Sequence, residues 1–256
     1  HAVLQAALKQ AVKERLIPYN PCENCRIPPK DKKEMTILPP EKIGRYLQEA
    51  EKYGVLPMFY LELSSGLRRG ELLALQWEDL NVKERILTVN KQVTRMEGEL
   101  DVTEPKTKNS VRKVALSQQA VDLLVQEHEQ HPDNPILFPS PRTGGYWSPD
   151  AVSRINRKLL KSAGIEEHVR FHDLRHTFAT MAISSGVDVK TLSSMLGHYS
   201  AGFTLDTYTH ITNDMQRGAA EKIGGFMESA TATTTPEPPD PPEGSRCKVI
   251  PFEKVG

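Results

Sequence analysis

The chain has 256 residues, in which 33 Lys and Arg balance 33 Asp and Glu, and its sequence pI is about 7.2. This length can bury a substantial core as one large domain or as one domain plus fragments. The balanced charge excludes the basic composition of many nucleic-acid-binding proteins, so any DNA-binding surface must be local. Only three cysteines and no secretory or long apolar segment occur, which excludes a disulfide framework and predicts a soluble, cytoplasmic protein without membrane contact.

The N-terminal segment is predicted to form a helix over Ala2–Leu16, because apolar residues recur there at helical spacing until Pro18. Its apolar face has no partner nearby, so we expect residues 1–27 to be the end of a domain whose earlier part is missing. Proline and dense charge are typical of a linker over residues 28–37. Cys22 and Cys25 have metal-ligand spacing but lack a second pair, so no metal is expected.

Residues 38–228 have the pattern of a mainly α-helical domain with a small three-stranded antiparallel sheet, an α+β fold. Strands are predicted at 86–94, 99–103 and 112–116, with a hairpin connection at Met96–Gly98 and a polar loop at Pro105–Ser110. Helical spacing and capping residues predict helices at Pro39–Lys52, Met58–Leu63, Arg69–Gln76, Gln118–His131, Pro149–Ala163, Leu174–Ser184, Val189–Met195 and Leu205–Ile211.

Residues 229–256 are predicted to be a flexible tail, because a Pro- and Thr-rich run cannot form a packed core. The tail ends in the apolar segment Lys248–Phe252. We expect this segment to dock on a neighbouring subunit, with a disordered tail as the alternative.

Two groups of cations stand at predicted helix starts. His172 and Arg175 are one turn apart and share a helix face, where an anion such as phosphate would offset their charge and that of the helix dipole. A purely structural role is equally compatible with the pattern. Arg68 lies at a loop-to-helix junction after Gly66, where a guanidinium can bind phosphate with two hydrogen bonds, and Arg69 is the alternative.

Two further side chains are less specific by themselves. Gly197 is the expected C-cap of a helix, which would place His198 on a turn. Tyr208 lies in a helical stretch among polar residues, so it is not required in a core. A solvated histidine and a surface tyrosine remain the simpler interpretations of these two residues.

Taken in order, the blocks Gly-Leu-Arg, Pro-Lys-Thr, His-x-x-Arg, Leu-Gly-His and Tyr-Thr-His resemble the signature of tyrosine recombinases of the phage-integrase type. The resemblance extends over residues 39–226 and is closest to integrases of phages and conjugative transposons. It implies that residues 38–228 are the catalytic domain. It also implies that residues 1–27 end in the last helix of a core-binding domain.

The resemblance implies a reaction in which Tyr208 attacks DNA phosphorus and forms a 3′-phosphotyrosyl link with a free 5′ hydroxyl. Arg68 and Arg175 would bind the non-bridging oxygens of the scissile phosphate, where permanent positive charge stabilises the transition state. A covalent intermediate preserves the phosphodiester energy, so neither a metal nor another cofactor is expected.

The resemblance also assigns the proton-transfer and hydrogen-bonding residues. Lys106 would donate a proton to the departing 5′ oxygen, with Lys108 as the nearby competitor. His172 would help accept the tyrosine proton, and His198 would donate a hydrogen bond to a phosphate oxygen.

The implied partners are double-stranded DNA at recombination sites, other copies of the chain in a tetramer, and accessory DNA-bending or excision factors. One alternative is a type IB topoisomerase, which uses the same chemistry to relax DNA. Another is a non-catalytic DNA-binding regulator that uses Val187–Gly197 as a helix-turn-helix. Because all six catalytic positions are filled, the recombinase is the favoured interpretation.

Overall fold

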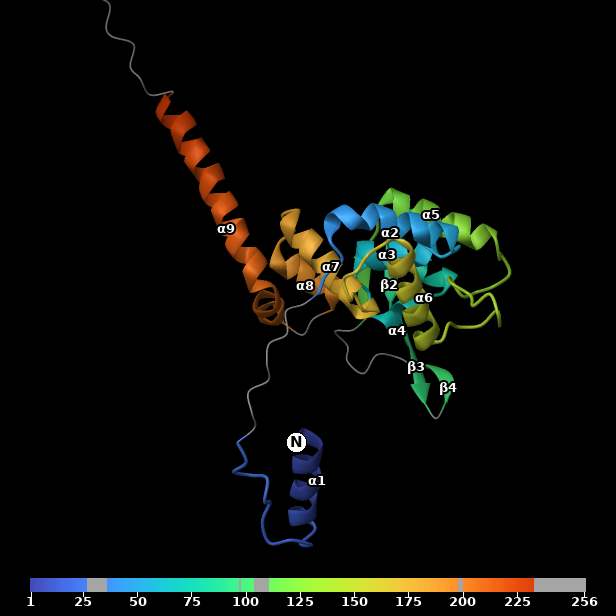
Figure 1. The fold of residues 1–256 in the computed structure, drawn as a ribbon, viewed down its shortest axis with the longest axis vertical. Coiled ribbons are helices and arrows are strands. Elements are labelled where there is room, and N and C mark those ends of the chain that lie inside the picture. Colours follow the sequence, from blue (N-terminus) through green and yellow to red (C-terminus); the bar gives the residue numbers. More distant parts are fainter. Residues whose placement is uncertain (27–35, 97, 104–110, 198–199, 233–256) are drawn as a thin grey trace, which may run out of the picture. The chain divides into compact units, whose positions relative to one another are not determined.

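The computed structural model describes residues 1–26, 36–96, 98–103, 111–197 and 200–232, and the chain divides into the units His1–Thr36 and Ile37–Gly256 (Figure 1). In the first unit, α1 (Ala2–Lys13) is shorter than predicted, because Arg15 adopts a φ of 60° that a helix cannot continue through. No side chain of α1 is fully buried, and Leu8, Ala11 and Val12 on its apolar face are half-buried among the described residues.

The first helices of the second unit begin and end at the predicted signals. Pro40 occupies the first turn of α2 (Pro40–Lys52), where its missing N–H costs nothing. The next helix, α3 (Leu56–Ser65), ends at Gly66 with a φ of 60°. A Cβ at Gly66 would lie 2.3 Å from Cδ1 of Phe178, so only glycine fits there. The chain then reverses into α4 (Arg69–Ala74).

The later helices of the second unit also depend on local caps. The Ser117 hydroxyl accepts from the Ala120 N–H at the start of α5 (Gln118–Glu129). Asp188 caps α8 (Val189–Leu196) in the same way, and Gly197 ends α8 with a φ of 63°. Two more helices, α6 and α7, lie between them in the chain, at Pro149–Ser162 and Phe171–Ser184.

The last described helix, α9 (Ala201–Ala232), is much longer than the predicted Leu205–Ile211, and it packs against α7 and α8. Its backbone is not helical at Tyr208, where φ is −117° and ψ is 24°. The helix includes residues 229–232, which we expected to begin the flexible tail; the expected docking segment at 248–252 lies outside the described residues. None of the helices in the described ranges is long and apolar enough to cross a membrane, α9 included.

The predicted three-stranded antiparallel sheet is present, but its membership was partly wrong. The sheet has the order β1-β2-β5, from Leu80–Asn81, Ile86–Val89 and Arg112–Ala115. The predicted strand 86–94 ends at Val89, and Asn90 and Lys91 belong to no strand. The Lys91 ammonium group lies 3.2 Å from the Asp79 carboxylate. The chain continues into a separate hairpin of β3 (Gln92–Met96) and β4 (Glu99–Thr103), and its Met96↔Glu99 pairing confirms the predicted connection.

Aromatic packing joins α2, α3 and the start of α7 in the core. The Phe59 ring lies edge-on to Tyr46 at 5.9 Å and to Phe171 at 5.7 Å. The Tyr46 hydroxyl donates to Asn156 on α6, and the Asn156 amide donates to the Val169 carbonyl just before α7. These contacts hold the beginning of α7, which carries His172 and Arg175, in a defined position.

Candidate active site

Three segments that are far apart in the chain meet at Arg175. Its guanidinium donates one hydrogen bond to the Gly66 carbonyl and another to the Leu196 carbonyl, each at 2.6 Å. The residue is 3% exposed. Arg175 therefore joins the loop after α3 to the end of α8, which is the structural role that the sequence pattern had left open.

Arg68 is held beside the same turn by a buried carboxylate. Its guanidinium donates to Glu71 at 2.8 Å and to the Gly197 carbonyl at 2.9 Å, and its backbone N–H also donates to Glu71. Arg112 on β5 binds both Glu71 oxygens, at 3.1 and 2.7 Å. The Arg68 side chain is 40% exposed whereas that of Arg112 is 6% exposed, so Arg68 can reach a ligand in solvent.

Arg69, the alternative to Arg68, points elsewhere. Its guanidinium donates to the Ser153 hydroxyl at 2.8 Å and to the Pro149 carbonyl on α6. Arg175, in contrast, donates to the Leu196 carbonyl, and Arg68 donates to the Gly197 carbonyl, immediately before His198 in the sequence. The geometry therefore pairs Arg68 with Arg175.

This cluster carries more positive than negative charge. Burial, followed by the nearby charges of Arg68 and Arg112, lowers the pKa of Arg175 to about 10. Glu71 is ionised, because Arg112 and Arg68 hold its pKa below the usual range despite its burial. Glu62 is fully buried, which raises its pKa well above the usual range and favours its neutral form. Three guanidinium groups thus face one ionised carboxylate, an arrangement that an anion would stabilise.

We therefore expect inorganic phosphate to stabilise the folded chain through this cluster. Saturating phosphate should raise the free energy of unfolding of the wild type by about 1–3 kcal/mol more than that of Arg175→Ala. Urea titrations at increasing phosphate concentration measure the difference. Arg69→Ala is the matched control and should keep the wild-type increment. Equal increments in the wild type and Arg175→Ala would show that the cluster binds no phosphate.

The start of α7 departs in one respect from expectation. The anion at this helix terminus is Asp173, which accepts from the Arg170 backbone N–H at 2.7 Å and from the Arg170 guanidinium. A bound phosphate is thus not required to offset the dipole there.

His172 is exposed and lines a hollow of about 640 Å³ together with Arg69, Arg157 and Arg170. Burial and the charge of Arg175 lower the pKa of His172.

Tyr208 is not the surface residue that its polar neighbours in the sequence suggested. It is 1% exposed, and its hydroxyl lies 2.7 Å from Nδ1 of His176. Burial raises the pKa of Tyr208 to about 12, while the charge of Arg175 acts in the opposite direction. The helix break at Tyr208 turns this side chain toward α7 and thus toward the residue next to Arg175.

The structure places four of the six candidate residues: Arg68, His172, Arg175 and Tyr208. Lys106, its competitor Lys108, and His198 lie outside the described residues. Sequence reasoning missed Glu71, Arg112 and His176. The spacing of Glu71, three residues after Arg68, is a capping signal that could have indicated its role, whereas nothing in the sequence pattern links Arg112 to Glu71.

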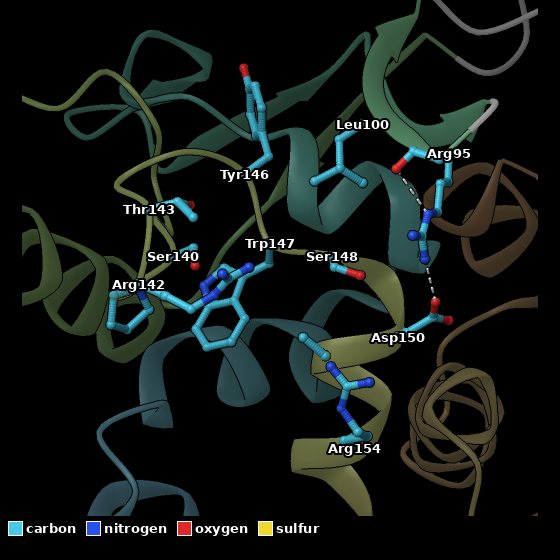
Figure 2. A pocket seen from close by; sticks show the side chains of 13 residues that line it. Arg95, Leu100, Ser140, Arg142, Thr143, Tyr146, Trp147, Ser148, Asp150 and Arg154 are labelled. Carbon is cyan, nitrogen blue, oxygen red and sulfur yellow. Dashed lines mark hydrogen bonds and ion pairs between the residues drawn. The ribbon is translucent and has the colours of Figure 1, made fainter.

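A second hollow, of about 630 Å³, lies between the β3–β4 hairpin and α6 (Figure 2). Arg95 reaches across it from the hairpin and donates to the Asp150 carboxylate at 3.1 Å. Trp147 and Arg154 also line it. None of the four described candidate residues does, so this hollow is separate from the site around Arg175.

Comparison with known proteins identifies the family of this chain. Residues 38–215 match the model of the phage integrase family, so the chain belongs to this family and the predicted resemblance is confirmed. It is 31% identical over 230 residues to the ICEBs1 integrase of Bacillus subtilis, covering 85% of this chain and 62% of that protein. It is 29% identical over 252 residues to a XerC-like tyrosine recombinase of Caldanaerobacter subterraneus, covering 88% and 64%.

Solved structures confirm the predicted fold class. The Tn1549 transposon integrase, in complex with a circular intermediate DNA, superposes with a TM-score of 0.72 at 22% identity, covering 86% of this chain and 76% of that one. The XerA recombinase has a TM-score of 0.60 at 27% identity, with 75% and 67% covered. The chain spans less than two thirds of the length of the two curated relatives from Bacillus and Caldanaerobacter.

Proposed function

We propose that this chain is a site-specific DNA recombinase that cleaves and rejoins strands through a 3′-phosphotyrosyl link at Tyr208, and so integrates or excises a mobile element. The observation that carries the proposal is the position of the buried Tyr208 phenol, whose hydroxyl lies 2.7 Å from Nδ1 of His176, the residue next to Arg175 on α7. Membership of the phage integrase family supports the same chemistry.

In this proposal Arg68 and Arg175 bind the non-bridging oxygens of the scissile phosphate. Their charge stabilises the additional negative charge of the transition state, and the hydrogen bonds to fixed backbone carbonyls keep Arg175 in place before DNA arrives. Lys106 protonates the departing 5′ oxygen and His198 donates a hydrogen bond to phosphate. His172, which lies at the exposed edge of the site, would help to accept the tyrosine proton, as the family resemblance implies.

The proposed partner is double-stranded DNA at recombination sites. The Tn1549 transposon integrase was solved in complex with a circular intermediate DNA, and the same fold is present in this chain. Assembly of a tetramer on paired sites, accessory DNA-bending or excision factors, and a cytoplasmic location complete the proposal. Residues 1–27 would end the core-binding domain, 28–37 link it to the catalytic domain at 38–228, and 229–256 follow as a tail.

The two alternatives make different chemical predictions. A DNA-binding regulator would form no covalent link to DNA. A type IB topoisomerase would form one but would relax supercoiled DNA without exchanging strands between two sites. The Bacillus and Caldanaerobacter relatives are an integrase and a recombinase, which favours strand exchange.

Trapping of the covalent intermediate tests the proposal directly. The wild-type chain is incubated with a tiled set of nicked duplexes that cover the DNA flanking its own gene, so that the released end diffuses away and prevents rejoining. We expect a denaturation-resistant protein–DNA adduct on a duplex in this set, and mass spectrometry should locate the modification on the Tyr208 peptide. The absence of any adduct, or an adduct on another residue, would contradict the proposal.

A further inference from the structure

The partner of the Tyr208 hydroxyl in this structure is His176, a residue to which the sequence motifs assign no role. Its Nδ1 lies 2.7 Å from the Tyr208 oxygen, which is hydrogen-bonding distance. His176 is adjacent to Arg175 on α7 and one turn after His172. The proposed nucleophile, Tyr208, therefore contacts the residue that follows the phosphate-binding arginine on α7.

Both partners of this hydrogen bond are uncharged at neutral pH. Burial, then the charges of His172 and Arg175, lower the pKa of His176 to about 4, so its ring is neutral at pH 7. The Tyr208 phenol is protonated at that pH, because burial raises its pKa to about 12. In the tautomer that carries its proton on Nε2, Nδ1 is the acceptor and the phenol the donor, so that the proton that Tyr208 must lose points at His176.

His172, which the family resemblance implies as the proton acceptor, is placed differently. Its ring centre lies 5.1 Å from that of His176, and its side chain lines the exposed hollow beside Arg69. Among the contacts of the described residues, Tyr208 is bonded to His176 and not to His172. In this structure His176 therefore contacts the Tyr208 hydroxyl, whereas His172 lies at the exposed edge of the site.

We propose that His176 is a further catalytic residue, which accepts the phenolic proton of Tyr208 during attack on DNA. The inference rests on the proposed strand-cleavage function. The Tyr208 oxygen bonds to phosphorus, its proton moves to Nδ1 of His176, the bond from phosphorus to the 5′ oxygen breaks, and Lys106 protonates that oxygen. On rejoining, the 5′ hydroxyl attacks phosphorus and returns its proton to Lys106, while His176 returns its proton to Tyr208.

Two features favour this catalytic role over a purely structural one, in which His176 would only hold the Tyr208 side chain in place. The backbone at Tyr208 is not helical, so a regular helix does not fix the phenol, which is 1% exposed and must move to reach the phosphate. Burial is the main reason that His176 is neutral, and the charge of Arg175 adds to it; a phosphate bound by Arg175 would offset that charge and raise the pKa of His176. DNA binding would therefore make His176 a stronger base when one is required.

Single-turnover cleavage of the nicked duplex that traps the wild type tests this role, with His176→Gln and His176→Ala as variants. Gln can accept the Tyr208 hydrogen bond but cannot take up its proton at neutral pH. We expect both variants to form adduct about 10²- to 10⁴-fold more slowly than the wild type. They should bind the duplex normally, and imidazole in solution should partly restore the rate of His176→Ala. His131→Gln, which alters a partly buried histidine outside the site, should cleave at the wild-type rate.

The pH–rate profile provides a readout that a structural role would not change. The charged and titratable groups described around His176 are His172, Asp173, Arg175 and Arg170 at the start of α7, together with Tyr208 on α9. The wild-type rate should fall in acid as His176 becomes protonated, and His176→Gln should lose that limb of the profile. Cleavage by His176→Gln at the wild-type rate would overturn this inference alone. A wild type without adduct would overturn the proposed function as well.

Discussion

Tyr208→Phe is expected to bind the duplex that traps the wild type with unchanged affinity and to form no covalent adduct. The substitution removes only the phenolic oxygen that would bond to phosphorus, and Arg68 and Arg175 keep their contacts with the carbonyls of the 66 and 196–197 turns. The free energy of unfolding should fall by about 1 kcal/mol, because His176 loses its hydrogen-bond partner. Denaturing gels and gel-shift titrations measure adduct formation and affinity, and urea denaturation measures the change in stability.

Tyr60→Phe is the matched control for this substitution. It also removes a phenolic hydroxyl that makes one hydrogen bond, in this case to Gln119 on α5. Tyr60 lies on α3 and contacts no candidate residue through that hydroxyl, so adduct formation should remain at the wild-type rate. If Tyr208→Phe still formed adduct, the nucleophile would have to be another residue.

Glu71→Ala is expected to destabilise the fold severely, by about 3–5 kcal/mol. Glu71 is 2% exposed and binds the guanidinium groups of Arg112 and Arg68 as well as the Arg68 backbone N–H. Its removal leaves Arg112, whose side chain is 6% exposed, without its carboxylate partner in a buried position. Urea denaturation at pH 7 measures the loss.

The pH dependence of stability adds a second criterion for Glu71. Because the folded state lowers its pKa, the stabilisation from Glu71 is complete above its unfolded pKa of about 4.3. It is lost as the pH falls through the lower folded value. Glu71→Gln should therefore lose less stability between pH 5 and pH 3 than the wild type does. Glu78→Ala, on an exposed side chain, should change stability by less than about 1 kcal/mol. Near-wild-type stability of Glu71→Ala would mean that the buried pair contributes little.

Most helices and the hairpin could be predicted because their signals are local. Backbone preferences alone begin or end helices at Pro40, Gly66 and Gly197. The side chains of Ser117 and Asp188 each accept from a backbone N–H group only three residues later in the chain. The errors arose where distant contacts overrode the pattern.

Two of these errors show the cause. The predicted strand 86–94 is divided into β2, which pairs with β1 and β5, and β3, whose partner among the described strands is β4. The predicted helix at 205–211 is part of a longer helix whose break at Tyr208 accompanies its contact with His176. The polar residues next to Tyr208 in the sequence indicated an exposed side chain. Its burial depends instead on the packing of α9 against α7 and α8.

The sequence by itself determined which side chains are available for phosphate chemistry and that Arg68 stands at a helix start, because motif order and capping are properties of short stretches of chain. Only the tertiary structure decided that Arg68 rather than Arg69 shares the 196–197 turn with Arg175. It also decided that Glu71 pairs with Arg112, and that His176 rather than His172 meets the Tyr208 hydroxyl. These choices join residues 21 to 129 positions apart, and they depend on packing and on the cost of burying charge, which no local pattern encodes.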